Sequence, residues 1–547
     1  MSVMAYMPYG AGGIIIRVET DIRRGIPGID ITGLAEGAVR EARDRVRAAF
    51  RNSGFSFPQD RILINLAPAG MKKDGAALDL PIALSVMAAA GIAPVSGNLL
   101  VMGELELSGK IRPVRGVLAA IAAGLAEGIS EFIVPAENAK EAAILAGKGA
   151  CFTAAENLQG AVHTLFIREE KGALPVSFDT AADIMRVSPY TRADTEAKAG
   201  ISDPACRGDS AMGDFAEVRG QSVYKRALEI AAAGGHNVLA FGPPGAGKTM
   251  LARRLPSIMA PLTSDEAVEV TRLYSLAGPH PGNGGNSRQF IDGLITDPPF
   301  RAPHHSASAE GILGGGRIPR PGEISLAHFG VLFLDEAPEF RVNVLQALRE
   351  PLEDRVISIV RAEGPVRLPA EFQLLMTANS CPCGRLGMRE TDSGCFCSPE
   401  EINRYWRKFG GALLDRVEIR VAVLPPKIEE MGKQCSDGEE HSAVIARRVM
   451  KAVEIQRRRF SGTSIRRNAL LPAGKAEALC PMSEKAQGAF HTAAAKLGLS
   501  GRAYHGILRV ARTIADLEGK EIIETEHILE AVQHRRLGED PWDILSL

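Results

Sequence analysis

The stretch FGPPGAGKTM, at residues 241–250, limits the fold of this chain more than any other segment. It has the spacing G-x-x-x-x-G-K-[ST], filled by Gly242, Gly247, Lys248 and Thr249. The apolar run HNVLAF precedes it and KTMLARRLP follows it, which predicts a strand, a glycine-rich turn and a helix. In that order, backbone N–H groups and the positive end of a helix dipole converge on one point. The segment therefore predicts a phosphate-binding loop in an α/β fold rather than a glycine turn without function.

The same loop supplies the candidate contacts to a nucleotide. Lys248 is placed to reach the β- and γ-phosphates of ATP, and the hydroxyl of Thr249 is placed to ligate Mg²⁺. ATP and Mg²⁺ are therefore the cofactors that we expect. The candidate nucleotide-binding residues are Gly242, Pro243, Pro244, Gly245, Ala246, Gly247, Lys248, Thr249 and Met250.

Two further apolar runs end in side chains that phosphoryl transfer needs. GVLFLDE ends in Asp335 and Glu336, and a buried parallel strand would place both acids at its carboxyl edge, where α/β folds bind ligands. Asp335 would hold Mg²⁺ through water, and Glu336 would polarise the attacking water. FQLLMTAN ends in Asn379, whose amide could position that water and sense the γ-phosphate.

Two arginines complete the candidate catalytic set. Arg416, in LLDRVEIRV, precedes another β-run, and an arginine at a domain edge can supply charge to the γ-phosphate of a neighbouring subunit. Arg502, in LSGRAYHGILR, opens a helix and could reach the nucleotide of its own chain. Each could instead be a solvated surface charge, but their order along the chain favours catalysis. The candidate catalytic residues are Lys248, Asp335, Glu336, Asn379, Arg416 and Arg502.

Composition limits the class of protein. A chain of 547 residues predicts roughly two to four domains. Its 45% hydrophobic and 24% charged residues are those of an ordinary soluble protein. No apolar run reaches the ~18–20 residues of a membrane span and no secretion signal is visible, so we expect a cytoplasmic protein without membrane partners. The net charge of −1 restricts nucleic-acid contacts to local patches.

Periodicity divides the chain into four segments. Residues 1–166 alternate β-rich runs such as RILINLA and EFIVPA with helical runs such as EGAVREARDRVRAAFRNSG. Residues 167–213 lose this periodicity and gain polar, Gly and Pro residues, which predicts a linker. Residues 214–432 carry the nucleotide motifs, and residues 433–547 have a helical pattern. The predicted fold class is α/β.

These motifs together resemble the ComM/YifB-type magnesium-chelatase-like AAA+ ATPases over nearly the whole chain. PFRAPHHSAS, PGEISLAHFGVLFLDE, ANSCPCG and RVARTIADLEG carry the resemblance, whereas TSDEAVEVTRLYSLAGPHPGNGGNSRQF is only loosely similar. The resemblance implies an AAA+ core with a helical lid, in a homo-hexameric ring with nucleotide between subunits. The family is implicated in ATP-driven DNA branch migration during natural transformation, which implies DNA and recombination proteins as partners. It assigns Lys248 and Thr249 to Walker A, Asp335 and Glu336 to Walker B, Asn379 to sensor 1, Arg416 to the arginine finger and Arg502 to sensor 2.

The first segment resembles the proteolytic α+β domain of the Lon protease. KDGAALD is similar to the loop that carries the Lon serine, but Ala77 stands at the serine position. Leu118, in RPVRGVLAA, stands at the position of the partner lysine. Because acyl transfer has no route without a nucleophile and its base, the resemblance implies a Lon-like domain without protease activity.

One predicted helix in this segment carries a basic face. Four arginines are spaced i, i+3, i+7 and i+11, which places them on one side of the helix, opposite a small apolar set. Acidic residues nearby could balance them as a solvated face, or they could form a DNA-binding stripe, and both interpretations stay open. The arginines are Arg40, Arg43, Arg47 and Arg51.

EDRVISIVRAEGPVRLPAEF contains two β-runs around Glu363-Gly364, which predicts a hairpin. It resembles the pre-sensor-1 hairpin of related helicases, and in a ring its arginines would bind DNA phosphates in the pore. Upstream, HHSASAEGILGGGRIPRPGE resembles a helix-2 insert, and its adjacent histidines, His304 and His305, are expected to point apart, which favours a structural or pore role over metal binding. The hairpin arginines are Arg355, Arg361 and Arg367, with Arg361 near the tip.

Four of the eight cysteines form two C-x-C pairs joined by a polar, glycine-containing loop. Four thiolates can close a tetrahedral structural Zn²⁺ site, although C-x-C is a less common spacing than C-x₂-C. Reduced thiols without metal, or a redox pair, are the alternatives. The four residues are Cys381, Cys383, Cys395 and Cys397.

Three functions fit these observations. The first is an ATP-driven hexameric motor that promotes branch migration or unwinding of single-stranded or branched DNA. The second is an ATP-dependent remodeller of protein complexes, like the magnesium-chelatase motor subunit. The third, an ATP-dependent protease, is disfavoured by Ala77 and Leu118. Motors that thread proteins usually carry an aromatic pore loop, and the arginines of this hairpin favour the DNA motor.

Overall fold

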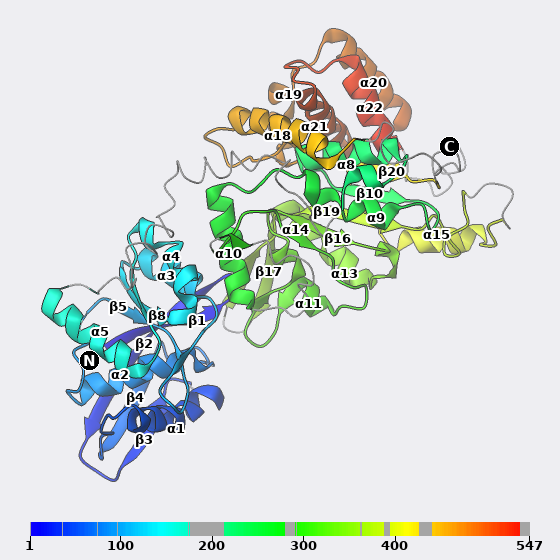
Figure 1. The fold of residues 1–547 in the computed structure, drawn as a ribbon. Helices are drawn as coiled ribbons and strands as arrows, with labels where there is room; N and C mark the ends of the chain where they lie inside the picture. Colours follow the sequence, from blue (N-terminus) through cyan, green and yellow to red (C-terminus); the bar gives the residue numbers. More distant parts are fainter. Residues whose placement is uncertain are drawn as a thin grey trace.

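The protein is a mixed α/β molecule, described by a computed structural model. In Figure 1, an N-terminal unit in blue and cyan adjoins a central unit in green, and the C-terminal helices in orange and red lie above the central unit. None of the described helices is both long and apolar enough to span a bilayer. The structure describes residues 2–34, 37–73, 75–95, 97–172, 174, 213–278, 290–291, 293–361, 364–387, 394–425 and 440–536.

A seven-stranded mixed sheet organises the N-terminal unit, in the order β3-β4-β2-β1-β5-β8-β9. β2 pairs antiparallel with β1 and β4, and the other neighbours are parallel. A small ribbon of β6 (Glu104–Leu105) and β7 (Ile111–Arg112) lies outside this sheet. The strands of the sheet are β1 (Ser2–Tyr9), β2 (Gly12–Arg23), β3 (Gly28–Thr32), β4 (Arg61–Ala67), β5 (Leu99–Val101), β8 (Glu131–Pro135) and β9 (Cys151–Ala155).

Helices cover both faces of this sheet because alternate residues of β1 enter different cores. Val3 and Ala5 pack with α1 and α2, whereas Tyr6 packs with α3. The last helix, α5, continues to Lys171 and ends at Gly172 in a left-handed conformation (φ 76°), so the helix enters the segment expected to be a linker. Residues 175–212 of that segment lie outside the described residues. The helices are α1 (Gly37–Asn52), α2 (Asp79–Ala89), α3 (Val117–Ala126), α4 (Ala139–Ala143) and α5 (Leu158–Lys171).

The central unit is built on a five-stranded parallel sheet in the order β13-β16-β19-β10-β20. Val238 and Ala240 of β10 pack on one side with helix α8 (Ser222–Gly234), and Leu239 and Phe241 pack on the other. Burial on both faces explains the continuous apolar runs in the sequence. The strands are β10 (Val238–Phe241), β13 (Phe300–Arg301), β16 (Val331–Leu334), β19 (Gln373–Ala378) and β20 (Ile419–Ala422).

Helix α10 (Ser264–Ala277) joins the central and N-terminal units. Leu276 of α10 packs into the apolar cluster around α3, and the backbone N–H of Gly116 donates to the carbonyl of Ser275 at 3.1 Å. Three of the described strand pairs form ribbons outside the central sheet: β11 (Phe290–Ile291) with β12 (Leu294–Ile295), β14 (Gly314–Gly315) with β15 (Arg320–Pro321), and β17 (Val356–Arg361) with β18 (Gly364–Pro369). The other helices are α9 (Lys248–Ala252), α11 (Ala309–Leu313), α12 (Glu323–Leu326), α13 (Val342–Ala347), α14 (Arg349–Asp354), α15 (Pro399–Arg407) and α16 (Gly411–Leu414).

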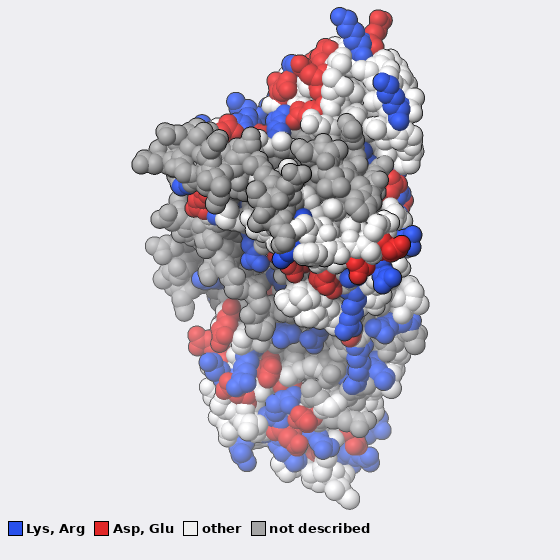
Figure 2. Space-filling model, turned by 90° about the vertical axis from the view of Figure 1, so that its right-hand side faces the viewer, with Lys and Arg blue, Asp and Glu red and all other residues white. Residues whose placement is uncertain are grey.

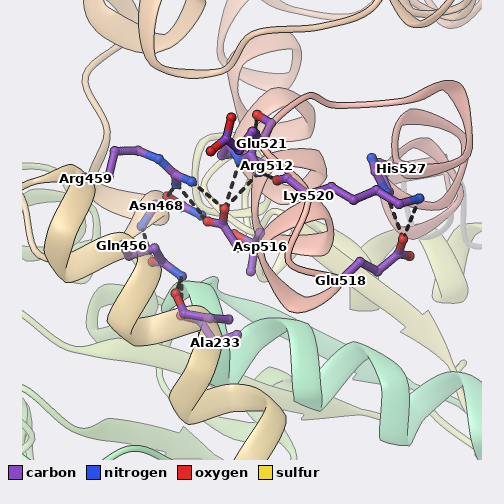
Figure 3. Close-up of polar contacts among 12 residues, drawn as sticks. Ala233, Gln456, Arg459, Asn468, Arg512, Asp516, Glu518, Lys520, Glu521 and His527 are labelled. Atoms are coloured by element: carbon purple, nitrogen blue, oxygen red, sulfur yellow. Dashed lines mark hydrogen bonds and ion pairs between the residues drawn. The ribbon is translucent and has the colours of Figure 1, made fainter.

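The C-terminal unit is helical and shares an apolar core with α8 of the central unit. A buried polar network fastens its helices internally, with Arg459 and Arg512 converging on the carboxylate of Asp516 (Figure 3). The helices are α18 (Ser442–Arg459), α19 (Ala473–Leu479), α20 (Glu484–Leu497), α21 (Gly501–Leu517) and α22 (Thr525–Arg536).

Candidate functional site

The glycine-rich loop lies between strand β10 and helix α9, as its sequence predicts. A Cβ added to Gly242 would stand 2.0 Å from the carbonyl oxygen of Val423, so only glycine fits where this loop passes the end of β20. Gly247 has φ 87° and precedes the first residue of α9. These two glycines turn the chain so that the N-terminus of α9 faces the loop.

Lys248 lies buried at the centre of the site. Its Nζ donates hydrogen bonds to the carbonyl oxygens of Gly242 (2.8 Å) and Pro243 (2.7 Å), and to Oδ1 of Asn379 (3.3 Å). Burial lowers the pKa of Lys248 to about 8, against the opposing effect of the Asp335 and Glu336 carboxylates. The ammonium group is therefore held by weak carbonyl partners that a phosphate can replace.

Asp335 receives two hydroxyl groups at the end of β16. Oγ1 of Thr249 donates to its Oδ1 at 2.8 Å, and Oγ1 of Thr377 donates to the same oxygen at 2.6 Å. A hydroxyl and a carboxylate oxygen from facing elements form the kind of hard donor set that Mg²⁺ takes when it also binds phosphates and water. Thr249 and Asp335 are thus the residues that fit Mg²⁺.

Glu336 follows Asp335 with an exposed side chain and a left-handed backbone (φ 51°). A positive φ is uncommon for a residue other than glycine and is typical of functional positions. Its backbone N–H donates to Oγ1 of Thr377 at 3.0 Å, which fixes this turn against β19. The carboxylate of Glu336 is therefore free to contact water at the edge of the sheet.

Thr377 and Gln221 are site residues that the sequence analysis does not single out. Thr377 is buried in β19, and a hydroxyl in an otherwise apolar strand is the signal that could have identified it. Nε2 of Gln221 donates to the carbonyl oxygens of Ala246 (3.1 Å) and Leu424 (2.6 Å), which connects the glycine-rich loop to the start of α8. No pattern around Gln221 points to this contact.

The structure does not bring Arg416 and Arg502 to this site. Both donate to one carboxylate: Nη2 of Arg416 contacts Oε2 of Glu353, and Nη2 of Arg502 contacts Oε1 of Glu353 at 2.7 Å. These three residues line a cavity of about 360 Å³ between the central and C-terminal units. In the described structure, Arg502 therefore contacts Glu353, which also binds Arg416, and does not contact the nucleotide loop of its own chain.

The predicted hairpin is formed by β17 and β18, with Arg361 opposite Gly364 in the last pair before the turn. Arg361 and Arg367 are exposed, and Val360 beside the turn is 81% exposed. Glu363, expected in the turn, lies outside the described residues.

Arg355 does not share the exposed surface of the hairpin with Arg361 and Arg367. It has a left-handed backbone (φ 58°) at the end of α14, and its Nη2 donates to the carbonyl of Leu470 in the C-terminal unit at 3.2 Å. The three arginines are close along the chain, but the left-handed turn at Arg355 directs this residue away from Arg361 and Arg367.

His304 and His305 also differ from expectation. Their ring centroids lie 4.1 Å apart, so the two side chains do not point apart. The alternation of side chains holds for strands, whereas these residues lie in a loop before α11. Nδ1 of His304 contacts Oγ of Ser306 at 2.7 Å, and no described cluster of metal-binding side chains includes either histidine.

The four cysteines come together immediately after Asn379. Cys381 Sγ lies 3.4 Å from Cys383 Sγ and 3.6 Å from Cys395 Sγ, and Cys383 Sγ lies 3.6 Å from Cys395 Sγ. The sulfur of Cys397 is the fourth of the cluster, and all four lie within 4.8 Å of one another. Tetrahedral Zn–S bonds of about 2.3 Å place sulfurs about 3.8 Å apart, so the cluster fits a structural Zn²⁺.

The thiols differ in their environments, and the cluster adjoins the nucleotide loop. Burial raises the pKa of Cys381 to about 11. Burial also acts to raise the pKa of Cys383, but backbone hydrogen bonds at Arg385 and Phe396 lower it to about 6. A Cβ on Gly384, next to Cys383, would stand 2.9 Å from Cδ of Pro244, which shows how closely the two loops pack.

In the N-terminal unit, Ala77 and Leu118 occupy the positions compared with the Lon serine and lysine. The backbone carbonyl of Ala77 accepts from the N–H of Gly103 at 3.2 Å, and the Leu118 side chain is fully buried. Asp79, close to Ala77, is buried and accepts two hydrogen bonds from Arg45, at 2.7 and 3.0 Å. The described groups here are apolar or paired.

The basic face of α1 is exposed at Arg43, Arg47 and Arg51, and the Arg40 side chain lies outside the described residues. The guanidinium carbon of Arg47 lies 5.4 Å from the centroid of the Phe57 ring. Nε of Arg43 lies 3.8 Å from Oδ2 of Asp44. The opposite face of α1 is buried, as the spacing predicts, at Val39, Ala42, Val46 and Ala49.

Comparison with known proteins follows the same division of the chain. The family profile "Magnesium chelatase, subunit ChlI" matches residues 214–431, "Subunit ChlI of Mg-chelatase" matches residues 18–138, and "Magnesium chelatase, subunit ChlI C-terminal" matches residues 439–535. Part of the chain is also 28% identical over 137 residues to the Lon protease of Solibacter usitatus, which covers 24% of this chain and 17% of that protein.

Full-length relatives are more similar. The chain is 39% identical over 527 residues to the protein YifB of Salmonella typhimurium, covering 95% of this chain and 94% of that protein. It is also 39% identical over 531 residues to the competence protein ComM of Haemophilus influenzae, covering 96% of both. This chain therefore belongs to the ComM/YifB-type family of magnesium-chelatase-like proteins.

Proposed function

We propose that this protein is an ATPase that drives a DNA motor, as a ring of identical subunits that promotes branch migration or unwinding. One observation carries the ATPase part of the proposal. The carboxyl ends of three adjacent parallel strands bring together Lys248, Thr249, Asp335 and Asn379 through direct hydrogen bonds. Four polar groups from three separate segments have no packing reason to meet at a sheet edge, whereas phosphoryl transfer requires such a set of groups.

Each residue then has a defined task. Lys248 exchanges its carbonyl partners for β- and γ-phosphate oxygens, and Thr249 and Asp335 hold Mg²⁺, which would neutralise phosphate charge. Glu336 accepts a hydrogen bond from the attacking water, and Asn379 orients that water towards the γ-phosphate. Thr377 keeps Asp335 and the Glu336 turn in register.

The position of two arginines supports the proposed ring. Among the described contacts, no arginine reaches the glycine-rich loop from the positions of Arg416 and Arg502, which meet at Glu353 instead. In a homo-hexamer both could serve the γ-phosphate bound by a neighbour, with the C-terminal helices as the lid. This assignment replaces the expectation that Arg502 reaches the nucleotide of its own chain.

DNA as the substrate is supported by the hairpin. Its exposed end presents Arg361 and Arg367 without an aromatic side chain, and basic groups on a projecting strand pair suit phosphate contacts along a strand of DNA. Recombination proteins would then be the partners that load or use the motor. The N-terminal unit would serve as a Lon-like domain without protease activity, because Ala77 and Leu118 supply neither nucleophile nor base.

The test separates ATP turnover from the response to DNA. Arg361→Ala should leave basal ATPase activity nearly unchanged, because it touches no residue of the nucleotide site. It should lower the stimulation by single-stranded and branched DNA, and strand displacement with it. Arg447→Ala, an exposed arginine on α18, is the matched control and should behave as the unmodified protein. Full DNA stimulation in Arg361→Ala would reject the pore contact and favour the remodeller of protein complexes.

A structural zinc ion is the second proposal, carried by the short mutual distances of the four sulfurs. We expect metal analysis of the purified protein to give about one zinc per chain. Cys381→Ser combined with Cys383→Ser should remove it, whereas Cys151→Ser, outside the cluster, should retain it. Metal-free protein with unchanged stability and ATPase activity would leave reduced thiols as the correct interpretation.

A further inference from the structure

Glu353 is a charged residue to which neither the sequence pattern nor the nucleotide site gives a role. It lies near the end of helix α14, half exposed, and its two oxygens receive different arginines. Nη2 of Arg416 contacts Oε2, and Nη2 of Arg502 contacts Oε1 at 2.7 Å. Arg416 follows helix α16 of the central unit, and Arg502 is the second residue of α21 in the C-terminal unit. One carboxylate therefore joins two arginines from two units.

A second contact holds the same two segments together. Oδ1 of Asp415, the residue before Arg416, accepts from Oγ of Ser500 at 3.1 Å. Ser500 caps the N-terminus of α21, two residues before Arg502, by accepting from the N–H of Ala503. Oδ1 of Asp415 also accepts from Nη2 of Arg535 at 3.0 Å. The backbones that carry the two arginines are thus fixed relative to each other. Glu353 joins their side chains, while Nη1 of Arg416 also donates to the carbonyl oxygen of Ala412 at 2.6 Å.

The geometry of the pair suits an anionic ligand. The three side chains line a cavity that is open to solvent, and the Arg502 side chain is 37% exposed. Two guanidinium groups and one carboxylate leave one net positive charge, and the carboxylate reduces the repulsion between the two arginines. The hydrogen bond from Arg416 lowers the pKa of Glu353, which favours the charged form of this carboxylate.

We propose that Glu353 is a positioning residue that holds Arg416 and Arg502 side by side, so that both reach the γ-phosphate of ATP in the neighbouring subunit as a preformed pair. The inference rests on the proposed function, since it assumes an ATP site completed by a neighbour. Without Glu353 each arginine still exists, but it samples other rotamers and must be ordered during each turnover. Removal of Glu353 should therefore lower the rate of ATP hydrolysis and not the affinity for ATP.

A structural role for Glu353 predicts a loss of folding or assembly in its variants, whereas a positioning role predicts a loss of hydrolysis rate alone. Ion pairs between partly exposed side chains contribute little to stability, so Glu353→Gln should fold and assemble normally. If the residue positions the arginines, the same variant lowers kcat about ten- to a hundredfold while the KM for ATP changes little. Glu350→Gln, on the same helix and without an ion pair to a described residue, is the matched control.

Mixed rings show on which subunit Glu353 acts. Subunits with Lys248→Ala cannot turn over ATP but still offer arginines, and subunits with Arg416→Ala and Arg502→Ala bind ATP but offer none. Mixing the two should restore ATPase activity that neither shows alone. Glu353→Gln placed in the first kind of subunit should lower the restored activity at least tenfold, and Glu350→Gln there should not. Placed in the second kind, Glu353→Gln has no arginines to hold and should change the activity less than about twofold.

The outcomes separate the site completed by a neighbour from the role of Glu353. Mixed rings that recover no activity would overturn the site completed by a neighbour, and the role of Glu353 with it. Recovery that is insensitive to Glu353→Gln in the arginine-offering subunit would overturn the positioning role alone. An equal loss from either subunit would also overturn it, because Glu353 would then act on folding or assembly.

Discussion

At the scale of the residue, the environment of Lys248 sets how this site responds to pH. The buried ammonium has a pKa lowered to about 8, and its partners are two carbonyl oxygens and an amide oxygen. A triphosphate would place several negative charges beside it, and nearby opposite charge raises the pKa of a lysine. We therefore expect the protonation of Lys248 and the binding of ATP to be coupled.

The coupling has a definite sign. Well below pH 8 the lysine is protonated with or without ATP, so binding takes up no proton there. Above about pH 8 the free protein has lost this proton and the complex regains it, so ATP affinity falls as the pH rises. Titration calorimetry at about pH 8.5 in two buffers of different ionisation enthalpy should detect net proton uptake. Lys248→Arg, whose guanidinium stays charged, should bind with less uptake, and equal uptake in both proteins would disprove the coupling.

At the scale of the element, the C-terminal helices depend on one buried carboxylate (Figure 3). Asp516 on α21 is 1% exposed and accepts from Arg459 (2.8 Å), Arg512 (3.1 Å) and Asn468 (2.8 Å). Arg512 is itself fully buried and donates to the carbonyl of Glu521 at 2.5 Å. The network links α18 and α21 with the turn that leads into α22.

Asp516→Ala should therefore destabilise this unit strongly. It leaves two arginines, one fully buried, without their carboxylate, and breaking a buried pair from one side costs about 3–5 kcal/mol. Thermal unfolding should show the C-terminal unit melting earlier than in the unmodified protein. Glu526→Ala removes an exposed carboxylate near the same turn and should shift the transition little. A transition in Asp516→Ala that matches Glu526→Ala would mean that the network contributes no net stability.

The sequence predicts elements well where period and turn chemistry agree. RILINLA is strand β4 residue for residue, α1 buries the expected face, and the strands before the loop and before Asp335 and Asn379 are present. The first strand, β1, is not predicted. Both of its faces are buried, so MSVMAYMPY lacks the alternation of apolar and polar residues that marks a half-buried strand. Contacts between distant segments could not be predicted, since neither the meeting of Arg416 with Arg502 at Glu353 nor the separation of Arg355 from Arg361 leaves a local pattern.

At the scale of the whole molecule, the positive and negative charges nearly cancel. The net charge is −1, and Figure 2 shows acidic and basic side chains interspersed over the face that it draws. A net charge near zero gives little long-range attraction to a polyanion, so binding of DNA by the proposed ring would have to rely on local contacts repeated around it. Two local basic surfaces compete for that role: the end of the β17–β18 hairpin and the arginine face of α1.

We expect the hairpin to be the surface that binds DNA, and salt dependence can decide between the two surfaces. Arg47 lies over the ring of Phe57 and Arg43 lies near Asp44, so part of the α1 face is engaged within its own unit. Replacing Arg43, Arg47 and Arg51 together by alanine should leave the salt dependence of single-stranded DNA binding unchanged. Replacing Arg361 and Arg367 should reduce the slope of log affinity against log salt by about 0.7 for each phosphate that the protein no longer neutralises. If the α1 variant lowers the slope and the hairpin variant does not, DNA contacts the N-terminal unit and the pore assignment is wrong.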